Sequence, residues 1–350
     1  MPIVLDPHEA AAYHERNTEP GSFLDMLSAA GYRAAVAGIR LGVFAALRPA
    51  PLPAAELAAD LGTDERGTRL LCDLLASTGY LSCEDGRFAN TPLATAWLAE
   101  GAAGYALVEL FWQRVIFQLW DDIEASVRTG RPAADFYAWL AEHPDLAEQF
   151  QTMLSRHAAV ISDEVTSLVP VPTDRPASVL DVGGGHATYA VALCRRHPSL
   201  RATVLDLQAA LVAGREAVTA ADLTDRIELR LGDHRRDDLG TGHDVVLLFN
   251  VLHGRDASAN QQLLVRVADA LGEDGAVVVL EHDLQPPPGA GRSAGAFLNT
   301  FGFNLFHGEG GQVYRLDELT GLLAAASLGS VTTRRLASSP LQHLLIARRG

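Results

Sequence analysis

A glycine turn beside an acidic residue is the clearest chemical signal in the sequence. The turn reads DVGGGHA from Asp181 and directly follows the apolar segment SVL, and its Gly183 and Gly185 let the backbone approach a ligand closely. A helix that starts after such a turn presents unpaired backbone N–H groups to the same ligand. The order of strand, glycine turn and helix therefore predicts a site for a nucleotide cofactor.

Acidic residues end three successive predicted strands: Asp181, Asp206 in VLDL and Asp233 in LRLGD. A carboxylate about 20 residues beyond the turn is placed to accept both hydroxyls of a ribose. Asp233 adds an acceptor for the exocyclic amine of adenine. The dinucleotide fingerprint needs a third glycine where Thr188 stands, and a sulfonium cofactor tolerates acids that would repel a pyrophosphate. These features favour S-adenosylmethionine over NAD.

Two histidines could serve the chemistry. Methyl transfer from a sulfonium to a hydroxyl needs a positioned nucleophile and a base that takes its proton. His253, in FNVLHGRD, lies just past the fourth predicted strand and has a side chain suited to base chemistry near neutrality. His307, in FNLFHGEGG, could join His253 in holding one metal ion with open positions for substrate and water. Both chemistries stay open.

The elements that must position these residues alternate between strands and helices after residue 169. Short apolar runs joined by helices predict an α/β fold with a largely parallel sheet covered on both faces, and ligands in such sheets bind at the carboxyl ends of the strands. We place the domain boundary at VPVPTDRP, which gives domains 1–168 and 169–350. The predicted strands are ASVLDV, RATVLDL, IELRLGD, DVVLLFNV, GAVVVLEH, VTTRRLA and LQHLLIAR.

The first domain is mostly helical. Residues 51–92 read as helix, turn, helix and hairpin with Asp85-Gly86 at the bend, which is a winged-helix pattern. Residues 51–100 carry eight acidic side chains against three basic ones, so packing against protein is favoured over DNA binding. Residues 104–168 are helical in periodicity and rich in aromatic side chains.

The overall composition indicates a globular cytoplasmic protein. A formal charge of -15 opposes binding to nucleic acid and to anionic membranes. The first residues contain no basic cluster leading into an apolar stretch, and no run approaches the roughly 18 apolar residues of a membrane span. Three scattered cysteines, Cys72, Cys83 and Cys194, fit a reducing compartment and no zinc site.

The motifs VLDVGGGHA, VLDL, GDH, LFNVLH and EGGQVY, in this order and spacing, resemble the class I S-adenosylmethionine-dependent methyltransferases. More narrowly, they are similar to the caffeate-type plant O-methyltransferases and their bacterial natural-product relatives. The resemblance covers almost the whole chain, because that family carries an N-terminal winged-helix domain for dimerisation and for closing the partner's active site. It implies a Rossmann-like sheet of seven strands with the last one antiparallel, a homodimer, and a small secondary-metabolite acceptor.

The resemblance also implies roles for individual residues. His253 would be the general base, and Glu281, in VLEHD, would orient it. We expect the cofactor to contact Asp181 and the matched positions Gly183, Gly185, Asp206, Leu207, Asp233 and His234, together with Asn250 at the end of the fourth strand. The apolar acceptor pocket would draw on Phe111, Trp112, Met153, Phe297, Asn299, Phe303 and Phe306.

The sequence departs from the family in the region of the base. The family usually continues His-Asp-Trp, whereas Gly254 and Arg255 follow His253, and a second family glutamate would fall near Val313. The segment with His307 resembles relatives that methylate the carbon next to the ketone of an α-keto acid on a metal held by two histidines. A non-catalytic S-adenosylmethionine-binding regulator and a relative that has lost methylation are the remaining alternatives.

Overall fold

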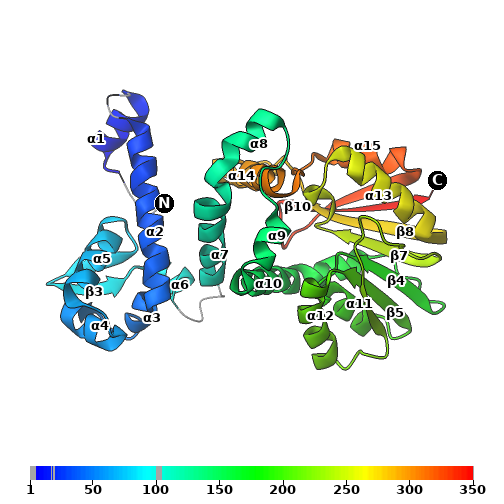
Figure 1. Ribbon diagram of the computed structural model, residues 1–350, viewed down its shortest axis with the longest axis horizontal. Helices are drawn as coiled ribbons and strands as arrows, with labels where there is room; N and C mark the ends of the chain where they lie inside the picture. The colour runs from blue at the N-terminus through cyan, green and yellow to red at the C-terminus, as the bar shows by residue number, and fades with distance from the viewer. Residues whose placement is uncertain (1–4, 17, 19, 100–104, 350) are drawn as a thin grey trace. The chain divides into compact units, whose positions relative to one another are not determined.

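The computed structural model describes residues 5–16, 18, 20–99 and 105–349 (Figure 1). The chain divides into two compact units, Met1–Phe117 and Gln118–Gly350. This division falls before the predicted boundary at 168/169, because α10 (Pro144–Leu168) packs Ala158, Ile161 and Val165 into the core of the C-terminal sheet. The assignment of dimerisation to residues 1–168 and of cofactor binding to residues 169–350 stays a prediction.

The N-terminal unit is mostly helical, with one small sheet of strand order β1-β3-β2. The predicted order of helix, turn, helix and hairpin is present, and Asp85 and Gly86 both adopt positive φ at the hairpin bend, as a tight two-residue turn requires. Its identification as a winged helix stays a prediction. The elements are α1 (Pro7–Ala10), η1 (Ala11–Glu15), α2 (Gly21–Leu41), α3 (Val43–Ala46), β1 (Leu52–Pro53), α4 (Ala54–Leu61), α5 (Glu65–Ser77), β2 (Leu81–Glu84), β3 (Arg87–Asn90), α6 (Pro92–Trp97) and α7 (Tyr105–Gln118).

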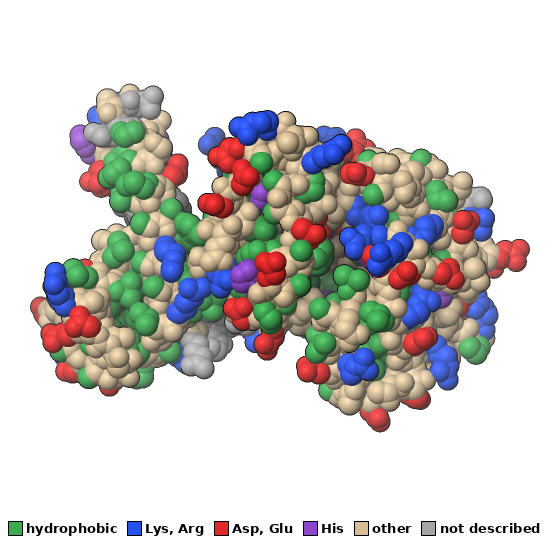
Figure 2. Space-filling model, in the orientation of Figure 1, with side chains coloured by type: hydrophobic (Ala, Val, Ile, Leu, Met, Phe, Trp, Pro, Cys, Tyr) green, Lys and Arg blue, Asp and Glu red, His purple; other side chains and the backbone are tan. Residues whose placement is uncertain are grey.

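This unit leaves apolar side chains on its surface, as the space-filling view shows (Figure 2). Phe44, Leu57 and Leu75 are buried in the apolar core of this unit. By contrast, Phe23 is 45%, Met26 57% and Trp97 49% exposed. Large apolar side chains exposed on this unit are typical of a surface that another protein covers. In the part of the chain that the structure describes, no helix has the length and apolarity needed to cross a bilayer.

The C-terminal unit contains the predicted seven-stranded sheet, with strand order β6-β5-β4-β7-β8-β10-β9. Strand β10 pairs antiparallel with β8 and β9, and the other pairings are parallel, which confirms the expectation of one antiparallel last strand. The strands are β4 (Ala177–Val182), β5 (Leu200–Asp206), β6 (Ile227–Leu231), β7 (His243–Phe249), β8 (Leu271–His282), β9 (Leu328–Arg335) and β10 (Gln342–Arg349).

Helices cover both faces of this sheet (Figure 1). Alternate strand residues point to opposite faces, so Val245 and Leu247 lie in one apolar core and Val246 and Leu248 in the other. The first core is closed by α10, α11 and α12, and the second by α13 and α15. The remaining elements are η2 (Leu119–Asp122), α8 (Ile123–Thr129), α9 (Phe136–Ala141), α11 (Thr188–Arg196), α12 (Gln208–Ala220), η3 (Leu252–Gly254), α13 (Ala257–Ala270), α14 (Gly291–Glu309) and α15 (Leu316–Ala325).

Helix α12 approaches the glycine turn after β4 closely. A Cβ atom at Gly214 would lie 2.3 Å from the backbone oxygen of Gly185 and 3.6 Å from the Cβ of Ala187. Because the nearest atom belongs to the backbone, a side chain at this position would displace the turn itself. Gly214 thus sets how closely the cofactor turn and α12 pack.

We expect Gly214→Ala to destabilise the protein by about 1–3 kcal/mol, because overpacking against backbone outweighs the helix propensity of alanine. Gly321→Ala is the matched control, since Gly321 lies in α15 with nothing within 4 Å of an added Cβ. That variant should gain about 0.4–1 kcal/mol. The midpoints of urea denaturation check both values, and equal midpoints for the two variants would contradict the close approach.

Candidate active site

Three successive glycines are required by the shape of the turn after β4. Gly183 and Gly185 have φ values of +72° and +20°, which other residues rarely adopt. A Cβ atom at Gly184 would lie 2.4 Å from the Cγ atom of Asp181. The backbone therefore passes directly over the Asp181 carboxyl group. Because the turn consists of glycines, no side chain covers its backbone.

Asp181 lies beneath this turn at the end of β4 and is only 1% exposed. Neither of its carboxylate oxygens has a hydrogen-bond partner among the described residues. Burial, and then the neighbouring Asp206, raise the pKa of Asp181 to about 7. An unpaired buried carboxyl is costly, so the site is prepared for a ligand that brings donors or positive charge.

Asp206 ends β5 beside the same turn. Its Oδ2 atom accepts the N–H of Gly185 at 2.9 Å, and its Oδ1 atom accepts the N–H of Leu207 at 2.7 Å. Burial raises the pKa of Asp206, and these two hydrogen bonds oppose the rise. Each oxygen keeps a second lone pair, so both can still accept a ribose hydroxyl. Leu207, which precedes α12, is 39% exposed.

Asp233, after β6, already has a partner that the sequence did not predict. The guanidinium of Arg235 donates from Nε to Oδ1 at 2.8 Å and from Nη2 to Oδ2 at 2.8 Å, and this pairing lowers the pKa of Asp233 to about 2. An adenine amine at Asp233 would have to share the carboxylate with Arg235. Beside it, burial and then Arg255 lower the pKa of His234 to about 4.

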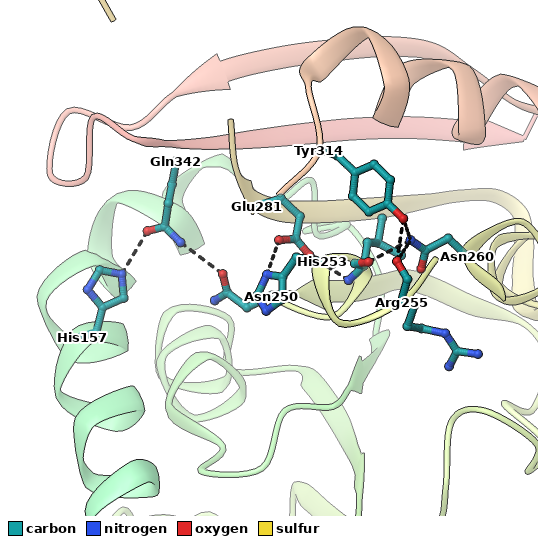
Figure 3. A network of polar contacts seen from close by, with 9 residues as sticks. His157, Asn250, His253, Arg255, Asn260, Glu281, Tyr314 and Gln342 are labelled. Atoms are coloured by element: carbon teal, nitrogen blue, oxygen red, sulfur yellow. Dashed lines mark hydrogen bonds and ion pairs between the residues drawn. The ribbon is translucent and has the colours of Figure 1, made fainter. Parts of the chain in front are cut away.

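The imidazole of His253 is held by a single carboxylate (Figure 3). Its Nδ1 atom lies 2.6 Å from Oε2 of Glu281, while Oε1 of Glu281 accepts the backbone N–H groups of Leu252 at 2.7 Å and His253 at 3.2 Å. A carboxylate partner fixes the proton on Nδ1 and leaves Nε2 as a proton acceptor. Burial lowers the pKa of His253, but the carboxylates of Glu281 and Glu309 outweigh it, so the pKa is raised.

The backbone that carries His253 is fixed on its carbonyl side as well. The Nδ2 atom of Asn260 donates to the Leu252 carbonyl at 2.8 Å, and the Tyr314 hydroxyl donates to the Arg255 carbonyl at 2.5 Å. The N–H of Gln312 donates to the His253 carbonyl at 2.8 Å. The short helix η3 is thus a rigid support for the base.

Asn250 lies in a separate chain of polar contacts (Figure 3). Its Oδ1 atom accepts from Nε2 of Gln342 at 3.2 Å, and Oε1 of Gln342 accepts from His157 at 2.9 Å. Asn250 has a φ of 57°, so the chain turns sharply as it leaves β7. A cofactor contact at Asn250 stays a prediction.

Aromatic rings of α14 pack beside His253. Phe301 meets His253 edge-on at a centroid distance of 5.3 Å, and Phe297 stacks on Phe301 at 6.0 Å. His282, at the end of β8, contacts both phenylalanines at 6.0 and 5.3 Å. Burial, then His253, lower the pKa of His282 to about 3, so its ring is neutral. The sequence predicted Phe297 but missed Phe301 and His282.

Phe303, Phe306 and Asn299 lie on other faces of α14. Phe303 packs against Trp120 at 5.6 Å and Phe306 against Phe303 at 6.1 Å, while Asn299 is exposed and donates to the Gly295 carbonyl within α14. Helical spacing explains the split, because positions 297 and 301 share one face of α14 and 303 and 306 another. The remaining three residues are Met153, half-buried on α10, and Phe111 and Trp112, which contact each other on α7 in the N-terminal unit.

His307 is buried away from any open coordination position. Its Nε2 atom donates to the Leu119 carbonyl at 2.7 Å, and its Nδ1 atom accepts from the Ser126 hydroxyl at 2.8 Å. Both ring nitrogens are therefore occupied by protein. No group of three or more potential ligands of the His, Cys, Asp or Glu type comes together among the residues that the structure describes. The geometry gives His307 the role of anchoring the end of α14.

Glu309 is the functional candidate that the motifs did not reveal. It ends α14, two residues beyond His307, and its Oε2 atom would lie 2.6 Å from a Cβ atom at Gly254. Glu309 belongs to the segment FNLFHGEGG, but only the packing of α14 against η3 brings it to the base.

Both units of the chain match known protein families. Residues 120–327 match the O-methyltransferase domain, and residues 30–100 match the O-methyltransferase dimerisation domain. The chain is 31% identical over 307 residues to a 3-hydroxy-5-methyl-1-naphthoate 3-O-methyltransferase of Streptomyces sahachiroi, which covers 86% of this chain and 87% of that protein.

Solved structures share the fold. The mitomycin 7-O-methyltransferase superposes with a TM-score of 0.81 at 26% identity, covering 95% of this chain and 98% of the other. An O-methyltransferase from neocarzinostatin biosynthesis, solved with S-adenosylmethionine and 2-hydroxy-5-methyl naphthoic acid, superposes with a TM-score of 0.76 at 24% identity, covering 91% and 96%. With both of its units matched, the chain belongs to the O-methyltransferase family.

Proposed function

We propose that the protein transfers a methyl group from S-adenosylmethionine to a hydroxyl of a small aromatic secondary metabolite, with His253 as the general base. One observation carries the proposal: Glu281 holds Nδ1 of His253 at 2.6 Å. The Nε2 atom has no hydrogen bond within the described residues, and the ring lies beside Phe301 at the carboxyl edge of the sheet. Geometry and tautomer both suit proton abstraction.

The residues at the glycine turn fit a cationic adenosine cofactor. The carboxylate of Asp206 suits a ribose, and the unpaired oxygens of Asp181 favour positive charge close by. Gly183, Gly184 and Gly185 leave the backbone open to a ligand. S-adenosylmethionine supplies the methyl group on a sulfonium that leaves as a neutral thioether.

His253 performs the proton step. As the acceptor oxygen forms its bond to the methyl carbon, the O–H bond breaks and the proton passes to Nε2 of His253. The imidazole then carries a positive charge, which the Glu281 carboxylate stabilises through Nδ1–H. Because Asn260 and Tyr314 already fix the backbone of η3, this group needs little reorganisation.

The walls of the site suit an aromatic acceptor. Phe297 and Phe301 offer apolar surface, and the neutral ring of His282 lies against both. Flat aromatic acceptors stack favourably on such side chains. The naphthoate O-methyltransferase similar to this chain acts, by its name, on a hydroxylated bicyclic acid. We therefore propose a phenolic hydroxyl as the methylated group.

We propose a homodimer in the cytoplasm, with no nucleic-acid or membrane partner. The matched dimerisation domain and the exposed apolar side chains Phe23, Met26 and Trp97 support the dimer. A net charge of -15 disfavours phosphate-rich surfaces.

His253→Gln should lower kcat by about 10²–10⁴-fold, because general-base catalysis is lost. Binding of S-adenosylmethionine, measured by titration calorimetry, should change little. Methyl transfer is followed by mass spectrometry over a panel of phenols, hydroxynaphthoates and α-keto acids. The exposed His8→Gln is the matched control. Wild-type turnover in His253→Gln would remove the proposed role of the base.

Asp181→Asn should stabilise the ligand-free protein at pH 8 and weaken cofactor binding. The folded pKa of about 7 lies above the ordinary 3.8, so the folded state binds more protons and stability falls as the pH rises from 3.8 to about 7. Asparagine removes that loss, whose upper bound is about 4 kcal/mol. Thermal unfolding of the variant and of the surface control Asp269→Asn, between pH 4 and pH 8, measures it.

The affinity of Asp181→Asn for S-adenosylmethionine should fall by about tenfold or more, because an attraction worth 1.4 kcal/mol corresponds to a factor of about ten. Titration calorimetry at pH 8 measures this change. A variant with the same pH dependence of stability as the wild type and the same affinity would show that Asp181 carries no charge in the site.

EDTA should leave methyl transfer unchanged, because both nitrogens of His307 are bonded to Ser126 and Leu119. Metal analysis of protein purified without chelator accompanies the assay. Loss of activity in EDTA that a divalent ion restores would instead support C-methylation on a metal held by His253 and His307.

A further inference from the structure

The end of α14 brings Glu309 against the backbone of η3. A Cβ atom at Gly254 would lie 2.6 Å from Oε2 and 3.6 Å from Cδ of Glu309, so the carboxyl group occupies the space that a side chain at position 254 would fill. The glycine therefore makes room for the acid. This places Glu309 at the residue next to His253.

The chain on either side holds Glu309 in this place. A Cβ atom at Gly311 would lie 1.9 Å from the His253 carbonyl oxygen, and the N–H of Gln312 donates to the same oxygen at 2.8 Å. Gly310, on the same side, ends α14 with a φ of 82°. Before Glu309, His307 is bonded to Ser126 and Leu119. The segment after Glu309 is thus fixed to η3 and the segment before it to η2 and α8.

Positions 254 and 313 lack the acids that the resemblance led us to expect. Val313 is 3% exposed and packs with Leu298 and Leu305 in an apolar cluster, so no carboxylate reaches the base from there. Gly254 has no side chain. Glu309 offers the one further carboxylate that, besides Glu281, acts on His253 among the described residues.

Glu309 makes no hydrogen bond with another described residue, and its charge is sensitive to the imidazole. Burial raises the pKa of Glu309 to about 7, and His253 opposes that rise. Among the residues that the structure describes, Asp135 and Tyr137 from the α9 region and Glu281 and His282 from β8 also face the pair. A charge on His253 thus favours ionisation of Glu309.

We propose that Glu309 is a positioning residue of the methyl transfer, whose carboxylate stabilises the protonated imidazole of His253 in place of the acids missing at positions 254 and 313. The inference rests on the proposed function only for its catalytic consequence. The coupling between the two groups exists in the protein without acceptor.

Histidine titration by NMR tests the coupling directly. The full-length protein is labelled at histidine, the His253 signal is assigned from its loss in His253→Gln, and its pKa is measured in Glu309→Gln. We expect the His253 pKa to fall by about one unit. Gly254→Ala, which pushes the carboxyl group aside, should lower it in the same direction, and the exposed Glu273→Gln should leave it unchanged. An unchanged His253 pKa in Glu309→Gln overturns the proposal.

Kinetics test the catalytic consequence. In Glu309→Gln the acidic limb of the kcat/KM profile should move down by the same unit, and kcat should fall about tenfold with little change in KM. Glu309→Asp should restore part of the loss. A rise in KM with an unmoved profile would make Glu309 an acceptor-binding residue and overturn the proposal. If His253→Gln transfers methyl as well as the wild type while the NMR shift is present, the proposed function fails and the coupling stands.

Discussion

The buried carboxylate of Glu281 fixes the geometry on which the reactive part of the fold depends. A carboxylate at 2% exposure is costly unless donors surround it, and here two backbone N–H groups and Nδ1 of His253 supply them. Those N–H groups converge only if the chain turns immediately after β7. The turn of η3 and the tautomer of His253 thus follow from one requirement, the satisfaction of a buried charge.

Strand order places this carboxylate beside the glycine turn. Strand β4 lies between β5 and β7, and β7 lies between β4 and β8, so the carboxyl ends of β4, β7 and β8 share one edge. A Cβ atom at Gly183 would lie 3.0 Å from Val251, two residues before His253. The glycine turn therefore packs closely against the segment that leads to the base. The chain order reverses at this point of the sheet, where ligands of open α/β sheets bind.

The sequence predicts the site residues that lie at strand ends. It does not predict which residues of a helix face the site, because that depends on how the helix is rotated about its axis. Asp181, Asp206 and His253 directly follow apolar runs, and a strand leaves few choices for where its end lies. Phe301 was missed and Phe303 chosen because aromatic composition does not say which face of α14 meets η3. The face is set by contacts between distant segments, such as His307 with Ser126.

His307 and Glu309 show the same limit. A histidine next to glycines is equally suited to metal binding and to capping a neighbouring carbonyl, and the Leu119 carbonyl that His307 contacts is far away in sequence. Glu309 acquires its place only because Gly254 and Gly311 allow two backbones to touch. Close backbone approach depends on tertiary packing, which a local pattern cannot express.

The acids of the site also explain why a cation belongs there. The charge of Asp206 raises the pKa of Asp181, that of Asp233 raises the pKa of Asp206, and that of Glu281 raises the pKa of Glu309. Like charges gathered in a buried site make the ligand-free protein less stable than its packing alone would allow. A positively charged ligand offsets this repulsion, so binding and stability are linked. The two phosphates of a dinucleotide would add to the repulsion. The acidic side chains that attract a sulfonium therefore disfavour a dinucleotide.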